Sequence, residues 1–90
     1  MLHSVSAAKL INGLTHAFAC EALALQRGLD GEESFITGLF SHMPIILGVD
    51  LETMLQELPL NHAIRHALVG YQGPLGELLL DVEACEWGVA

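Results

Sequence analysis

Pairs of candidate metal ligands spaced four residues apart are the features of this sequence most suited to chemistry. His62 and His66 form one pair, and His16 and Cys20 form a second, with Glu21 next to the cysteine. On a helix this spacing places both side chains on one face, as in two-histidine zinc sites. A zinc site also needs a third or fourth ligand, which each pair would have to take from another helix. We favour a structural interpretation, in which the histidine pair is solvated and Cys20 is a buried thiol in close helix packing.

The other polar residues do not form a pattern that is typical of catalysis. No serine stands in the strand–turn–helix context of a nucleophile elbow, and the adjacent Ser41 and His42 would point about 100° apart on a helix. Gly73 and Gly76 flank Pro74, but a phosphate-binding loop needs more glycines and a lysine. We therefore expect no catalytic residue, no metal and no cofactor, and we predict that the chain is not an enzyme.

Composition and charge narrow the classes of partner. The 90 residues suffice for a single domain (1–90), and 16% of them are charged, whereas about a quarter are charged in an average globular chain. Because 52% are hydrophobic, we expect another protein to cover part of the surface, either in a homo-oligomer or as a neighbouring domain of a larger chain. The net charge of −8, with Lys9, Arg27 and Arg65 as the whole basic complement, argues against nucleic acid and anionic membranes.

Several features predict a cytoplasmic location. Acidic residues, histidine or arginine interrupt every apolar run before the roughly 18 residues that a membrane span needs. Residues 1–9 lack the basic patch, apolar stretch and small-residue cleavage site of a signal peptide. In such a setting the two cysteines, Cys20 and Cys85, are expected to be reduced and buried.

Hydrophobic residues at helical spacing predict an all-α fold, a compact bundle of about five helices. In the first expected helix, one apolar stripe is formed by Ile11, Leu14, Phe18, Ala22 and Leu25. A glycine at position 28 is a natural end for this helix, and the histidine at position 16 falls off the stripe.

The second expected helix begins at Asp30 and is apolar on more than one side, so we expect it to be the central element. Asp30 can accept a hydrogen bond from the amide of Glu33, whose side chain can reach back, as in a capping box. Pro44 predicts a kink or break near residues 41–43, because proline removes one helical hydrogen bond. Gly48 is the expected end.

Three shorter helices complete the prediction. Asp50 and Asn61 are the expected caps of the first two, which end before Pro59 and at Gly70, and Pro74 suits the first position of the last. The residues expected to face inward in the last two helices are Ile64, Leu68, Val69, Leu75, Leu78, Leu79, Val82 and Cys85.

The order of features from about His16 onward resembles that of HDOD domains, the HD-related output domains of bacterial signalling proteins. The matching segments are LPL at 58–60, IRHAL at 64–68, Gly70, GPLGELL at 73–79 and EACEWG at 83–88. Upstream, SFITGLFS at 34–41 resembles the helix in which true HD phosphohydrolases carry their His-Asp metal ligands. The resemblance is strongest to HDOD domains joined to EAL cyclic di-GMP phosphodiesterase domains, and it covers only the C-terminal half of an HDOD domain.

This resemblance implies a non-catalytic module. Where an HD hydrolase would have His then Asp, the chain has Ser41 and His42, so the metal pair is dismantled. The missing N-terminal half would leave an apolar face uncovered, in agreement with the composition. We therefore predict a protein–protein interaction module in cyclic di-GMP-linked signalling, with no chemistry of its own.

The expected partner-contact residues lie on the second and last helices. They are Phe40, Ile45, Leu79 and Trp87. Two alternatives remain open at this point. One is a residual metal-dependent phosphohydrolase in which the histidines at positions 16, 42, 62 and 66 gather one ion. The other is a purely structural helical subunit without a link to nucleotide signalling.

Overall fold

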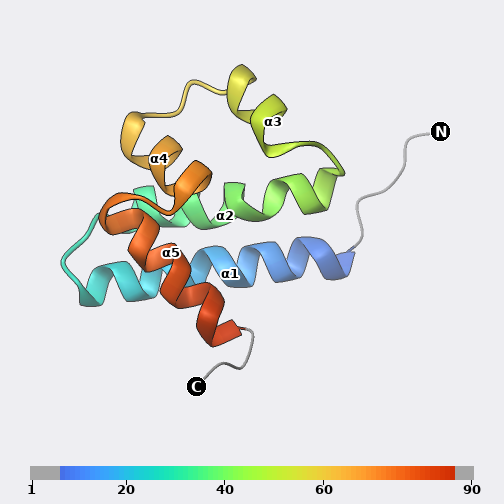
Figure 1. Cartoon of the computed structure of the whole chain (residues 1–90). Helices are drawn as coiled ribbons and strands as arrows, with labels where there is room; N and C mark the ends of the chain where they lie inside the picture. The colour runs from blue at the N-terminus through green and yellow to red at the C-terminus, as the bar shows by residue number, and fades with distance from the viewer. Residues whose placement is uncertain (1–6, 87–90) are drawn as a thin grey trace.

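The structure is a computed structural model of the chain, and it describes residues 7–86. These residues form five α-helices and no strand, which confirms the predicted all-α fold (Figure 1). The helices are α1 (Ala7–Gln26), α2 (Gly31–Leu47), α3 (Leu51–Glu57), α4 (His62–Gly70) and α5 (Gly73–Glu86).

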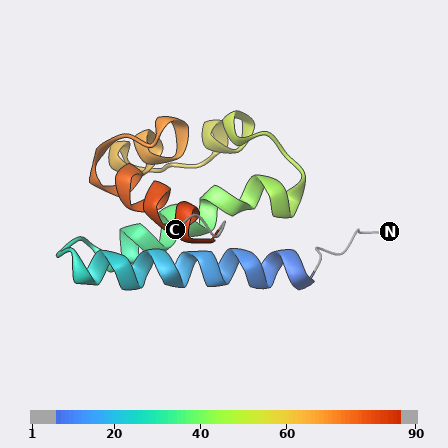
Figure 2. The ribbon, with the colours of Figure 1, turned by 60° about the horizontal axis from the view of Figure 1, so that its bottom comes forward.

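Helices α1 and α2 form an antiparallel pair, and the other three helices cover α2 (Figure 1). Gly28 ends α1 with a φ of 74°, a left-handed conformation that glycine adopts without steric cost. As predicted, α2 is the central element, because it packs against each of the other four helices. Figure 2 shows that the other helices all lie on one side of α1, so one long side of this helix is left uncovered.

The start of α2 is capped as the sequence predicts, but Glu33 has a different partner. Asp30 Oδ1 accepts a hydrogen bond from the Glu33 amide at 3.0 Å. The Glu33 carboxylate was expected to reach back to Asp30, whereas its Oε2 accepts a hydrogen bond from Asn61 Nδ2 at 2.9 Å. Asn61 also caps α4, since its Oδ1 accepts from the amide of Ile64 at 2.9 Å. One asparagine therefore caps α4 and links it to the start of α2.

Proline at position 44 was predicted to kink or break the second helix near residues 41–43, and the helix is not broken there. Helix α2 continues through the proline to Leu47 and ends at Gly48, whose φ is 70° and whose amide donates to the carbonyl of Pro44 at 2.8 Å. Pro44 lies three residues from the helix end, so only the hydrogen bond to the carbonyl of Phe40 is lost. Packing of α2 against four helices outweighs this single missing bond.

The main core lies between α1, α4 and α5, with contributions from α2 and α3. Its buried members are Cys20, Ala24, Leu55, Ile64, Ala67, Leu68, Leu75, Leu78, Leu79 and Val82. Two residues predicted to face inward do not do so: Val69 and Cys85 are exposed. Both lie near the C-terminal ends of their helices.

Arg65 and Gly76 hold the last three helices together. The Arg65 guanidinium donates to the backbone carbonyls of Leu55, Leu58 and Leu60, at 2.8, 2.8 and 3.3 Å. It thereby satisfies carbonyls at the end of α3 and in the following loop, where no helical donor is available. Gly76 lies directly against the backbone of Tyr71, so that the turn into α5 has no room for a side chain at this position.

The described helices do not include a clear membrane span. Within residues 7–86, no single helix has both the length and the apolar composition needed to cross a bilayer. Helices α2 and α3 meet that requirement only when they are taken together, and they are bent by 119° relative to each other.

Candidate functional site

The apolar stripe predicted for the first helix exists, but its side chains are largely exposed and not buried in the core. The exposed fractions are 61% for Ile11, 57% for Phe18 and 66% for Leu25, and Leu14 and Ala22 are exposed as well. An amphipathic helix is expected to turn its large apolar side chains to the core. We call the surface formed by these five residues the outer face of α1.

Small residues occupy the opposite side of α1, which packs on α2. The residues buried there are Gly13, His16, Ala17, Cys20 and Ala24. They allow the two backbones to approach closely: a Cβ atom at Gly38 of α2 would lie 3.0 Å from the Ala17 Cα and 2.8 Å from the Cys20 Sγ. Because a close helix contact accepts only small side chains, the large ones are left on the outer face.

His16 lies off the predicted apolar stripe and belongs to the buried side of α1. Its ring lies against that of His42 on α2, with 4.2 Å between the ring centroids and an interplanar angle of 47°. His16 is fully buried and His42 is half-buried. The predicted burial of Cys20 is confirmed, so the His16 and Cys20 pair lies inside the α1–α2 contact.

The outer face of α1 contacts α2 through one ring and has little charge. The Phe18 ring contacts the Phe35 ring of α2 edge-on, with centroids 5.1 Å apart. Lys9 and Glu21 are the only charged residues within α1. Beyond its C-terminal end, Arg27 is paired with Asp81 of α5 at 2.6 Å.

A shallow apolar groove runs beside this face, between α1 and α5. Its volume is about 430 Å³, and its lining residues are Ala19, Ala22, Leu23, Gln26, Val82 and Cys85. Because Ala22 belongs both to the groove and to the outer face, the two form one continuous apolar surface.

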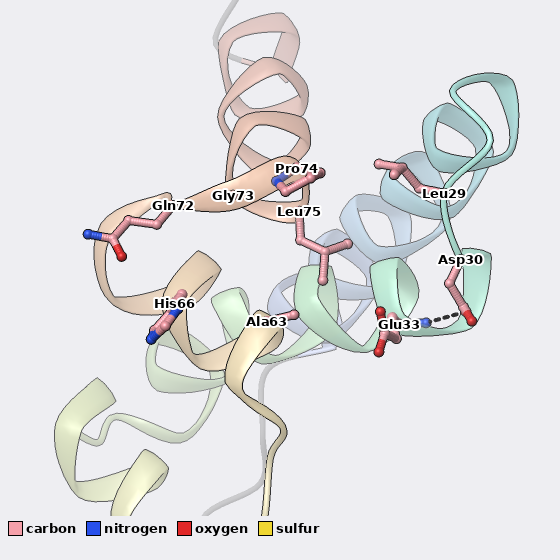
Figure 3. A pocket seen from close by; sticks show the side chains of 9 residues that line it. All are labelled: Leu29, Asp30, Glu33, Ala63, His66, Gln72, Gly73, Pro74 and Leu75. Atoms are coloured by element: carbon pink, nitrogen blue, oxygen red, sulfur yellow. Dashed lines mark hydrogen bonds between the residues drawn. The ribbon is translucent and has the colours of Figure 1, made fainter.

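A second hollow, of about 290 Å³, lies where the start of α2 meets α4 and the start of α5 (Figure 3). Leu29, Pro74 and Leu75 contribute apolar surface, with Asp30 and Glu33 on the α2 side and His66 on the α4 side. Gln72, Gly73 and Ala63 complete the lining. Both carboxylates already accept hydrogen bonds, from the Glu33 amide and from the Asn61 side chain. This hollow suits a small apolar group with a positive charge better than an anion.

The histidines do not gather around one point. His62 and His66 are exposed on α4, with ring centroids 6.0 Å apart, as predicted for a solvated pair. His16 and His42 lie in the contact between α1 and α2. Among residues 7–86, no group of three or more histidine, cysteine, aspartate or glutamate side chains is arranged to hold a metal ion.

The predicted contact residues have different environments. Ile45 is 59% exposed near the end of α2, so it is available to a partner. Phe40 is half-buried and packs against the core. Leu79 is 1% exposed and is a core residue, which corrects its assignment as a contact residue. Trp87 lies outside the described residues.

The sequence analysis did not identify the outer face of α1 as an exposed surface. A signal was present: Gly13, Ala17, Cys20 and Ala24 repeat every three or four residues, the same period as the large stripe. Two apolar faces on one helix indicate either complete burial or a second protein partner.

Fold and surface together define a small all-α protein with an exposed apolar helix face. The chain is similar to the cyclic di-GMP phosphodiesterase CdgJ of Vibrio cholerae serotype O1 (strain ATCC 39315 / El Tor Inaba N16961), with 39% identity over 54 residues. The aligned part is 60% of this chain and 12% of CdgJ, so the chain spans a small part of that relative. No family model matches the sequence, and no solved structure matches the chain.

Proposed function

We propose that the chain is a non-catalytic interaction module of the HDOD type, which acts in cyclic di-GMP-linked signalling through the outer face of α1. The observation that carries this proposal is the exposure of Ile11, Phe18 and Leu25 on a helix whose other side is packed. A contiguous exposed apolar surface of this kind is typical of protein contact sites. The similarity to a cyclic di-GMP phosphodiesterase supports the signalling context.

The residues at the position of the HD metal pair support a non-catalytic role. Ser41 Oγ donates a hydrogen bond to the carbonyl of Gly38 at 2.7 Å, one turn earlier in the same helix. The ring of His42 packs on His16. The Ser41 hydroxyl is therefore bonded within α2 and the His42 ring lies in the α1–α2 contact. A serine hydroxyl is also a poor replacement for an imidazole or carboxylate ligand.

A substitution on the outer face tests the proposal in the organism that encodes the chain. We expect overexpression of the chain to change the cellular cyclic di-GMP concentration, measured by mass spectrometry, and Phe18→Glu to abolish this change. Glutamate places a charge at the centre of the apolar contact. Leu80→Glu is the matched control, because Leu80 is also apolar and 52% exposed but lies on α5. Far-UV circular dichroism and immunoblotting should show that both variants are folded and equally abundant.

Two outcomes would argue against the proposal. If the Phe18→Glu variant acts as the unsubstituted chain does, the outer face of α1 is not the contact surface. If the purified chain hydrolyses cyclic di-GMP with Mg²⁺ or Mn²⁺, and His42→Ala abolishes turnover, the module is a phosphohydrolase.

A further inference from the structure

We propose that the protein that covers the outer face of α1 is a second copy of the chain, paired antiparallel about a two-fold axis at Phe18. This inference rests on the proposed function, because it assigns a partner to the same face. It goes further by naming the partner, the axis and the residues that meet across it.

The large and small residues of the outer face are placed symmetrically about Phe18. Ile11 and Leu25 each lie seven residues from Phe18, and Leu14 and Ala22 each lie four residues from it. In an antiparallel pair centred on Phe18, Ile11 of each copy therefore meets Leu25 of the other. A two-fold interface needs a self-complementary surface of this kind, in which residue i meets residue j and j meets i.

In this pairing a leucine of one copy lies opposite an alanine of the other, so the two surfaces are complementary in shape. Ala22 lines both the outer face and the groove between α1 and α5. The side chain of Leu14 from the second copy would lie opposite this small residue, at the mouth of the groove. Large-to-small pairing lets two helices interdigitate without a void or a clash.

The spacing of the exposed residues also agrees with direct helix–helix pairing. Ile11, Phe18 and Leu25 follow one another at intervals of seven residues, with Leu14 three residues after the first. Apolar residues at this spacing form the seam of two-stranded helical contacts. Helix α1 has 20 residues, which gives a length of about 30 Å, so positions 11–25 span two heptads. Glu21 occupies the second seam position of the later heptad, so the apolar seam is interrupted once.

The available area fits a weak, reversible dimer. The large residues of the outer face, Ile11, Leu14, Phe18 and Leu25, are between 36% and 66% exposed. With about 200 Å² for each large side chain, they offer roughly 440 Å² per copy. A pair would bury about 900 Å², which falls in the range of weak, transient contacts.

The net charge of each copy predicts how the strength of association depends on salt. Each copy has a formal net charge of −8, so two copies repel each other, whereas the five residues of the outer face carry no charge. Glu21, three residues after Phe18, adds a further like charge beside them. Salt screens the repulsion and does not weaken an apolar seam. Association should therefore strengthen between about 0.05 M and about 0.5 M NaCl, the reverse of an interface made by ion pairs.

Sedimentation equilibrium of the full chain tests the partner. We expect a concentration-dependent dimer, an increase in the dimer fraction with salt, and at least a 100-fold larger dissociation constant for Phe18→Glu. Leu80→Glu should leave the constant unchanged. A monomer at every concentration and salt would overturn the inference, and so would a dimer that persists in Phe18→Glu.

Mixed disulfide formation tests the register. In a Cys85→Ser background, Leu14→Cys mixed with Ala22→Cys should give more cross-linked dimer under mild oxidation than either variant alone. Equal cross-linking of all combinations would overturn the antiparallel register.

The two proposals fail separately. If the chain is monomeric and Phe18→Glu still abolishes the effect on cyclic di-GMP, the face binds a different protein and only the second-copy inference is refuted. If the chain dimerises through Phe18 but never alters cyclic di-GMP, the proposed signalling role is refuted and the dimer stands.

Discussion

Replacing Gly38 with alanine should destabilise the contact between α1 and α2, because the position has no room for a methyl group. A Cβ atom there would lie 2.8 Å from the Cys20 Sγ and 3.0 Å from the Ala17 Cα. The second of these atoms belongs to the backbone, which cannot rotate away. Overpacking a tight core costs about 1–3 kcal/mol, and the better helix propensity of alanine offsets about 1 kcal/mol of it. We expect a net loss of up to about 2 kcal/mol in the free energy of unfolding.

Gly13→Ala is the matched control on the other helix of the same contact. A Cβ atom at Gly13 would lie 2.8 Å from Ile46 Cδ1, the far end of a flexible side chain, and 3.5 Å from the Cβ of His42. The isoleucine side chain can move by the few tenths of an ångström that are needed. Gly13→Ala should therefore range from neutral to about 1 kcal/mol more stable, through helix propensity alone.

Urea unfolding followed by far-UV circular dichroism measures both variants at one fixed protein concentration, since self-association would raise the apparent stability. Thermal unfolding should show the Gly38→Ala loss as a decrease in Tm of about 4–8 °C per kcal/mol. Adding Cys20→Ala to Gly38→Ala should cost less than the sum of the single changes, because it removes the clashing sulfur. The reasoning is refuted if Gly38→Ala is as stable as Gly13→Ala.

Three further predictions concern helices α4 and α5 and the turn between them. Gly76→Ala should cost at least about 3 kcal/mol and leave little folded protein by circular dichroism, because the new methyl group would overlap the Tyr71 backbone. The hydrogen bond to Glu83, then burial and the charge of Glu83, raise the pKa of Tyr71 from 10.0 to about 12. Because the pKa is raised in the folded protein, the stabilisation from this pair is present below pH 10 and is lost as the pH rises through 12. The absorbance change of the single tyrosine should have its midpoint near pH 12, and nearer pH 10 in the Glu83→Gln variant. Arg65→Lys should lower the free energy of unfolding in urea by about 1–3 kcal/mol, because lysine cannot reach three backbone carbonyls at once.

Helix boundaries could be predicted because their signals are local. Asp30 and Asn61 supply cap acceptors to amides three residues later, and Gly28 and Gly48 take the left-handed conformation that ends a helix. The hydrogen bond between Glu33 and Asn61 could not be predicted, because it joins residues 28 positions apart whose proximity depends on the packing of α4 on α2.

The main feature that could not be predicted was which side of α1 faces the core. Hydrophobicity favours burial of Phe18 and Leu25, yet the buried side is the one with Gly13 and Ala17. The choice depends on Gly38, a residue of another helix that permits close approach only to small side chains. A pattern read along one helix does not contain this information, because shape complementarity is a property of two helices.

The same packing choice explains how a short chain can both fold and offer a surface. A helix that is apolar on all sides is normally buried on all sides. In this chain, the small residues of α1 are enough to hold α2 at close range, and α4 and α5 complete the core with Leu68, Leu78 and Leu79. Because Ile11 and Leu25 are not needed for that core, substitution of these residues should change association far more than folding, which separates a contact surface from a poorly covered core.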